Sequence, residues 1–128
     1  MAEMSNFLED ALINATLRNT SYTSPTTTYL ALYTTDPTDA DTGTEVSGGS
    51  YARQAITFSS PSNGATSNSD AIEFPTATGS WGTITHIGIR DAVTSGNLLY
   101  HTPLDASKAI GSGDIFRISA TNLTVTLA

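Results

Sequence analysis

Cysteine is absent from this chain of 128 residues. Neither disulfides nor a thiolate metal site can therefore stabilise the fold, and the sequence carries no information about the redox compartment. A chain of this length is expected to form one domain and to bury roughly two thirds of the surface that it exposes when unfolded. The fold must depend on an ordinary apolar core.

Basic residues are scarce, with five Lys and Arg against twelve Asp and Glu and a formal net charge of −7. The five are Lys108, Arg18, Arg53, Arg90 and Arg117. Nucleic-acid binding requires clustered cations that neutralise phosphates, and an anionic membrane surface would repel an acidic chain. We therefore expect neither a direct nucleic-acid partner nor a membrane partner.

Long apolar runs are also missing, since none approaches the ~20 residues that span a bilayer. The N-terminal stretch MAEMSNFLED lacks the basic start and apolar centre of a secretory signal. We expect the chain to be made in a cytoplasm and to reach its place of action without a cleaved signal.

One amphipathic helix is predicted near the N-terminus, at residues 6–17. Asn6 and Glu9 have the spacing of a capping box, in which an N-cap side chain is followed three residues later by an acid. The apolar residues that follow at helical spacing are Phe7, Leu8, Ala11, Leu12 and Ala15. This apolar stripe has two interpretations: it covers a sheet of the same chain, or it contacts another subunit.

From residue 26 onward the apolar pattern changes to a period of two, which is typical of strands. The strand segments are TTTYLALYTT, YARQAITFSS, DAIEF, WGTITHIGIR, LLYHTPL, DIFRISA and NLTVTLA. Asn63-Gly64 predicts a tight turn, and Gly82 and Gly88 inside a strand indicate close approach of a backbone or a bulky side chain. Trp81 to Arg90 is expected to alternate cleanly between two faces.

About seven or eight strands, with turn signals roughly every 8–12 residues, predict a mainly β fold. We expect an antiparallel β-sandwich with one short N-terminal α-helix. The predicted organisation is a helix and linker arm over residues 1–24 and the β-sandwich domain over residues 25–128.

The chain contains no recognisable catalytic motif. There is no GxSxG elbow, Walker loop or HExxH pair, so we expect no enzyme and no cofactor. His86 and His101 are isolated, and a metal site would need a third donor such as Asp91 or Asp105. We therefore expect no metal.

The loop from Asp36 to Ser50 holds a third of the acidic residues: Asp36, Asp39, Asp41 and Glu45. Their order does not match a calcium-binding EF-hand loop, whose glycine comes sixth. We expect a flexible acidic loop bound to water. The pair Gly48-Gly49 would let it turn back into the sheet with positive φ.

Aromatic residues and arginine are enriched at protein interfaces. Tyr51 and Arg53 are expected to project toward a neighbouring subunit. Trp81 is either an anchor in a partner's pocket or, as is more common for a single tryptophan, part of the core. The predicted interface residues are Phe7, Leu8, Leu12, Tyr51, Arg53 and Trp81.

The ordered set FLEDAL, TYLALYTTDP, TEVSGGSYARQAITF, FPTATGSWGTITHIGI, GNLLYHTPL and IGSGD…LTVTL resembles small virion proteins of tailed bacteriophages. Members of this group are called tail-fibre proteins, and similar β-sandwich domains serve as capsid cement (decoration) proteins. The resemblance runs from about Phe7 to Leu127 and implies a virion structural protein made in the host cytoplasm.

The favoured hypothesis from this resemblance is a cement protein, a homotrimer that binds the major capsid protein on the outer capsid surface. Binding to the assembled lattice, and not to its dissociated subunits, would stabilise the DNA-filled head. The first alternative is a tail-fibre module that recognises a host surface polysaccharide. The second is a carbohydrate-binding β-sandwich of cellular origin.

Overall fold

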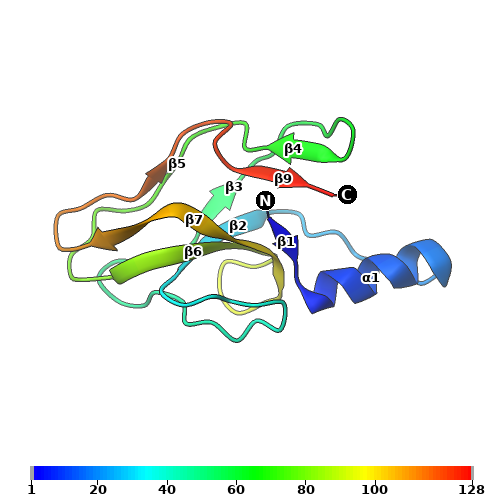
Figure 1. The fold of residues 1–128 in the computed structure, drawn as a ribbon, viewed down its shortest axis with the longest axis horizontal. Coiled ribbons are helices and arrows are strands. Elements are labelled where there is room, and N and C mark those ends of the chain that lie inside the picture. The colour runs from blue at the N-terminus through cyan, green and yellow to red at the C-terminus, as the bar shows by residue number, and fades with distance from the viewer. Residues whose placement is uncertain (1, 128) are drawn as a thin grey trace.

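The computed structural model describes residues 2–127, which form one helix and nine strands (Figure 1). The helix is α1 (Asn6–Leu17). The strands are β1 (Glu3–Met4), β2 (Thr28–Tyr33), β3 (Gln54–Ile56), β4 (Ala65–Ser67), β5 (Ile72–Glu73), β6 (Gly82–Arg90), β7 (Leu98–Ile110), β8 (Arg117–Ile118) and β9 (Thr124–Thr126). All strand pairs are antiparallel, which confirms the mainly β fold with one short helix.

The largest sheet has five strands in the order β1-β7-β6-β2-β3, and two further sheets pair β4 with β9 and β5 with β8. In Figure 1 the β4–β9 pair lies above the β6–β7 hairpin. The core joins these layers. Its residues include Leu30, Leu32, Ile84, Ile87 and Ile89 from the main sheet, and Ile72, Phe74, Phe116, Leu123 and Val125 from the small sheets and their flanks.

Strand β6 does not alternate cleanly, contrary to the sequence prediction. Ile84 and Ile87 both lie in the core although they are three residues apart. The register against β7 shifts between Ile84 and His86, whose partners Lys108 and Pro103 are five residues apart, so the extra residues of this irregularity lie in β7. Strict alternation of buried and exposed side chains therefore fails between Ile84 and Ile87.

Glycine occupies two positions of β6 for different structural reasons. A Cβ at Gly88 would lie 2.8 Å from both Leu98 Cδ1 and Tyr33 Cε1, so the predicted close approach is confirmed there. Gly82 instead has a φ of +79°, and its nearest neighbour lies 3.5 Å from an added Cβ. Backbone conformation, and not crowding, explains the glycine at position 82.

The N-terminal segment is more than the predicted arm, because β1 forms the edge of the main sheet through Glu3↔His101 and Met4↔Tyr100. The predicted helix bounds are confirmed, but the predicted cap is wrong. Ser5 is the N-cap, and its Oγ accepts a hydrogen bond from the Leu8 amide at 3.2 Å. Asn6 is already the first helical residue. Residues 1 and 128, the outer limits of the two predicted segments, lie outside the described residues.

The helix has 12 residues. Among the described residues, no helix is long and apolar enough to cross a membrane.

Candidate interaction surface

Helix α1 is fixed to the body of the protein at its N-terminal end. The Ser5 hydroxyl donates to the carbonyl of Leu98, and the Ser5 amide donates to Leu99 O at 2.9 Å. Leu8 is the buried residue of the helix, with 4% exposure. In Figure 1 the helix extends away from the sheets beyond this first turn. The helix is therefore anchored at one end and projects at the other.

The projecting part of α1 carries exposed apolar side chains. Ile13 is 53% exposed and Leu17 is 79% exposed. They are four residues apart and so share one side of the helix, about 140° (Ile13) and about 180° (Leu17) around the axis from the buried Leu8. Of the predicted interface residues on the helix, Phe7 is exposed (41%), Leu12 is half-buried and Leu8 is buried. The sequence prediction did not include Ile13 and Leu17, which lie outside the stripe that meets the sheet.

Trp81 is part of the core, with 4% exposure, and is not free to enter a partner's pocket. Its indole Nε1 donates to Gly49 O at 2.9 Å. Its ring meets the Tyr51 ring edge-on, with centroids 5.5 Å apart. Gly48 and Gly49 have φ of +76° and +55°, as predicted, and a Cβ at Gly49 would lie 2.9 Å from the indole nitrogen. The glycine pair thus folds the loop against Trp81.

Tyr51 and Arg53 are also bound within the chain, which corrects the expectation that they face a neighbouring subunit. Tyr51 Oη donates to Glu45 Oε2 at 2.6 Å and accepts from the Leu32 amide at 3.0 Å. Arg53 donates hydrogen bonds to both carboxylate oxygens of Glu45, with Nε–Oε2 at 2.8 Å and Nη2–Oε1 at 2.7 Å. The Arg53 and Glu45 side chains are 8% and 24% exposed. This cluster closes the end of the loop onto β2.

The titration of this cluster reflects its burial. Burial, and then donation to Glu45, raise the pKa of Tyr51 far above its ordinary value. Burial of Glu45 raises its pKa, but the hydrogen bonds from Arg53 and Tyr51 outweigh burial and hold the pKa below its ordinary 4.5. The hydrogen bonds to Glu45 raise the pKa of Arg53. All three groups keep their usual charge at neutral pH.

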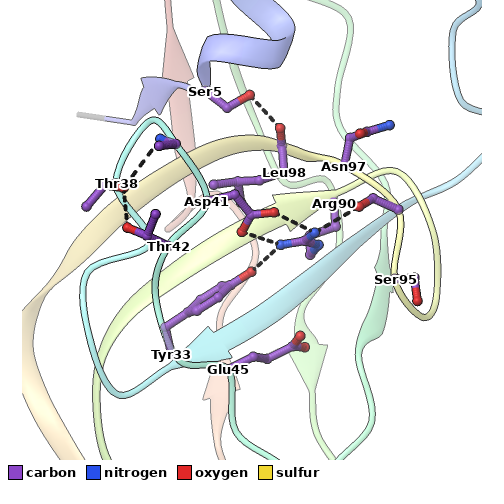
Figure 2. A network of polar contacts seen from close by, with 12 residues as sticks. Ser5, Tyr33, Thr38, Asp41, Thr42, Glu45, Arg90, Ser95, Asn97 and Leu98 are labelled. Atoms are coloured by element: carbon purple, nitrogen blue, oxygen red, sulfur yellow. Dashed lines mark hydrogen bonds and ion pairs between the residues drawn. The ribbon is translucent and has the colours of Figure 1, made fainter.

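The acidic loop folds over the second face of the main sheet, where it was expected to be flexible and bound to water. Figure 2 shows Asp41 and Tyr33 converging on Arg90. Both Asp41 oxygens accept from Arg90 at 2.8 Å, and Tyr33 Oη and Gly96 O accept at 2.9 Å. Burial opposes the charge of Arg90, yet the bonds to Asp41 and Tyr33 raise its pKa. The loop thereby covers Ala31 and Tyr33, so β2 is buried on both faces.

The two histidines lie beneath the same loop. They are offset along the hairpin, since Gly88 is the partner of His101 and Pro103 is the partner of His86. His101 Nε2 lies 2.7 Å from Asp39 Oδ1 and 3.9 Å from Glu3 Oε2. The acids near His101 are therefore Asp39, Glu3 and Asp36, and not the predicted Asp91 or Asp105.

A groove of about 520 Å³ opens between β7 and residues 116–124. Lys108 and Arg117, two of the five cationic side chains, line it together with polar groups such as Ser119 and Asn122. Its aromatic lining residue, Phe116, is 3% exposed and offers no ring for stacking on a sugar. This groove was not predictable from the sequence, because β7 and the C-terminal segment come together only in the folded chain.

A comparison with known protein families identifies the family of this small β protein. One protein family matches residues 3–126, nearly the whole chain, and is described as "Podophage GP4 fiber I protein gp80". A comparison with curated proteins found no match. The match confirms the resemblance to small virion proteins of tailed phages and makes the chain a virion structural protein. The chain belongs to the family of podophage GP4 fiber I protein gp80.

Proposed function

We propose that this chain is a fibre component of the virion that attaches to another virion protein through helix α1. The family description supports a fibre. The observation that carries the attachment is the exposure of Ile13 and Leu17 on a helix whose buried residue, Leu8, lies in the first turn.

The energetics favour a partner for this helix. Isolated helices shorter than about 12–15 residues are marginal in water, and helices in proteins are stabilised mostly by packing of an apolar face. Full burial of an aliphatic side chain contributes about 1.5–3 kcal/mol. Ile13 and Leu17 are already partly covered, so burying both in a partner would contribute roughly 2–4 kcal/mol. That is a useful share of the affinity of an interface that is repeated around a virion.

The attachment is tested with Ile13→Ser and Leu17→Gln together, since each pair of residue types has similar helix propensity. The matched control is Ile115→Ser, because Ile115 is equally apolar and 49% exposed but lies outside the helix. We expect the double variant to fold, with an unchanged circular dichroism spectrum of the sheets, and to be depleted from purified virions. Normal incorporation of the double variant would refute attachment through α1.

A cement role on the head is the second candidate, favoured by the absence of any repeated fibrous shaft sequence in the chain. Its partner would be the major capsid protein. Antibody labelling of intact virions, viewed by electron microscopy, separates the two candidates. Label on the tail or its fibres supports the fibre component, and label spread over the heads replaces it with the cement role.

The assembled form is expected to be a homotrimer, and light scattering on the purified chain checks this expectation. A monomeric mass at high protein concentration would refute the expectation of a trimer. Tyr51, Trp81 and Asp41 of the acidic loop make hydrogen bonds inside the chain, so we do not propose them as contacts for a host polysaccharide. Any glycan would have to use another surface, such as the groove beside Lys108 and Arg117.

A further inference from the structure

We propose that Glu3, Asp39 and His101 bind one divalent cation of the zinc class. Their donor atoms all lie within 4.8 Å of one another. His101 Nε2 is 2.7 Å from Asp39 Oδ1 and 3.9 Å from Glu3 Oε2. The His101 side chain is 4% exposed, whereas those of Glu3 and Asp39 are 72% and 49% exposed. The imidazole is therefore held rigidly, and the carboxylates lie on the solvent side, where an ion can enter.

The backbone brings these three donors together from distant parts of the chain. Glu3 and His101 are direct partners in the β1–β7 ladder, so their side chains stand on the same face of the sheet. Asp39 comes from the acidic loop, which is held to the sheet by the Asp41–Arg90 ion pair. The Asn6 amide donates to Asp39 O at 2.8 Å and fixes the loop beside the start of α1. The approach of the donors thus follows from pairing that is independent of any ion.

The distances are close to those of a metal site. Zinc lies about 2.0–2.2 Å from nitrogen and oxygen ligands, so two ligands of one ion are at most about 4.4 Å apart. The 3.9 Å between His101 Nε2 and Glu3 Oε2 is too long for a hydrogen bond but falls within this limit. The 2.7 Å contact to Asp39 must lengthen by roughly half an ångström when the ion replaces the shared proton. The half-exposed Asp39 side chain has room for this movement.

The charge around His101 favours a cation. Asp36 Oδ1 adds a third carboxylate, 3.9 Å from both His101 Nδ1 and His86 Nε2. Within residues 2–127, no ion pair joins an arginine or lysine to Glu3, Asp36 or Asp39. The nearby arginines are committed elsewhere, Arg90 to Asp41 and Arg53 to Glu45. A divalent ion would offset this negative charge.

The donor types select the ion. One imidazole nitrogen with carboxylate oxygens suits zinc and similar first-row ions, whereas calcium and magnesium prefer oxygen ligands alone. Asp36 Oδ1 lies 3.9 Å from His101 Nδ1, too far for a direct hydrogen bond, and contributes negative charge on that side of the imidazole. The bound ion would clamp β1, the acidic loop and β7 together at the base of α1. This inference does not rest on the proposed function.

The test is a calorimetric titration of the untagged full chain with zinc chloride, with Glu3→Gln as the main variant. The control is Glu73→Gln, a carboxylate of similar exposure (61%) that pairs with Arg117 at 3.7 Å, away from the site. Loss of an outer-shell partner alone commonly weakens metal binding 10–100-fold, so loss of the Glu3 ligand should weaken it at least about tenfold. Asp39→Asn should have a similar effect, and Glu73→Gln should bind as the unaltered chain does.

Histidine NMR supplies a second readout. Long-range ¹H–¹⁵N spectra should show one equivalent of zinc shifting His101 Nε2 while His86 Nε2 stays unchanged, and millimolar calcium should not displace the zinc. Absence of binding, equal affinity of Glu3→Gln and the unaltered chain, or a shift at His86 alone would each overturn the site. Displacement by calcium would overturn the choice of ion.

Discussion

The ion pair between Glu45 and Arg53 offers the sharpest test of how the acidic loop is held. The substitution Glu45→Gln keeps the size of the side chain and removes its charge. Arg53 then loses a bidentate acceptor while its own side chain is only 8% exposed. Breaking a fully buried pair costs about 3–5 kcal/mol. Because Glu45 is 24% exposed, we expect a loss of about 2–3 kcal/mol in the free energy of unfolding at pH 7.

The assay is urea unfolding followed by the fluorescence of Trp81, which is the single tryptophan and is buried beside Tyr51. Circular dichroism provides a second probe of the same transition. With roughly 3–5 °C per kcal/mol for a chain of this size, the midpoint of thermal unfolding should fall by about 6–15 °C. The control Glu73→Gln removes a pair in which Arg117 and Glu73 are 52% and 61% exposed. That change should cost less than about 1 kcal/mol.

The pKa of Glu45 also predicts how its contribution to the free energy of unfolding changes with pH. The pKa of Glu45 in the folded protein lies below its ordinary 4.5. Its contribution to stability is therefore fully present above about pH 4.5 and is lost as the pH falls through the folded-state pKa. The difference between the unaltered chain and Glu45→Gln should accordingly shrink in acid. Equal effects of Glu45→Gln and Glu73→Gln at pH 7, or a difference that persists unchanged in acid, would refute the reasoning.

Three further substitutions test the packing and the turns. Gly88→Ala should destabilise the fold by about 1–3 kcal/mol, because the added methyl meets Leu98 and Tyr33 at 2.8 Å; an unchanged urea midpoint would contradict this close packing. Gly48→Ala meets no atom within 4 Å, so its expected cost of about 1–2 kcal/mol comes from the φ of +76° alone, and a neutral result would show that the loop adopts another backbone conformation. Ser5→Ala should cost about 1 kcal/mol and speed amide exchange in the first turn of α1, since the N-cap acceptor is lost; exchange as slow as in the unaltered chain would argue against Ser5 as the cap.

Local features of the fold were predictable from the sequence because their causes are local. The helix bounds follow from the helical spacing of apolar residues, and the structure has them at Asn6–Leu17. Asn63 and Gly64 both have positive φ (53° and 76°) and form the predicted turn, with paired backbone bonds between Ser62 and Ala65. The N-cap of the helix was nevertheless predicted one residue too late, at Asn6 instead of Ser5. Ser5 and Asn6 are both good caps, and the contact of Ser5 with Leu98 decides between them.

The site could be predicted only in part, because alternation tells which side chains share a face but not what covers that face. Tyr51 and Arg53 read as surface residues until the loop brings Glu45 against them. The register between β6 and β7 shifts between Ile84 and His86, and no residue type in either strand predicts this irregularity. Leu17 and Ile13 are apolar in the sequence, yet only the placement of α1 shows that nothing else in the described chain buries them.

By itself, the sequence determined the chemical limits of this protein and its local structure. Those limits are no thiol chemistry, few cations, β-rich segments with strong turns, and a short helix at the start. The tertiary structure alone decided the relations between distant residues: Asp41 with Arg90, Glu45 with Arg53, and Glu3 with His101. The physical reason is the distance along the chain over which each kind of interaction acts. Propensity and periodicity act over a few residues, whereas charge pairing and burial depend on which segments the whole chain brings into contact.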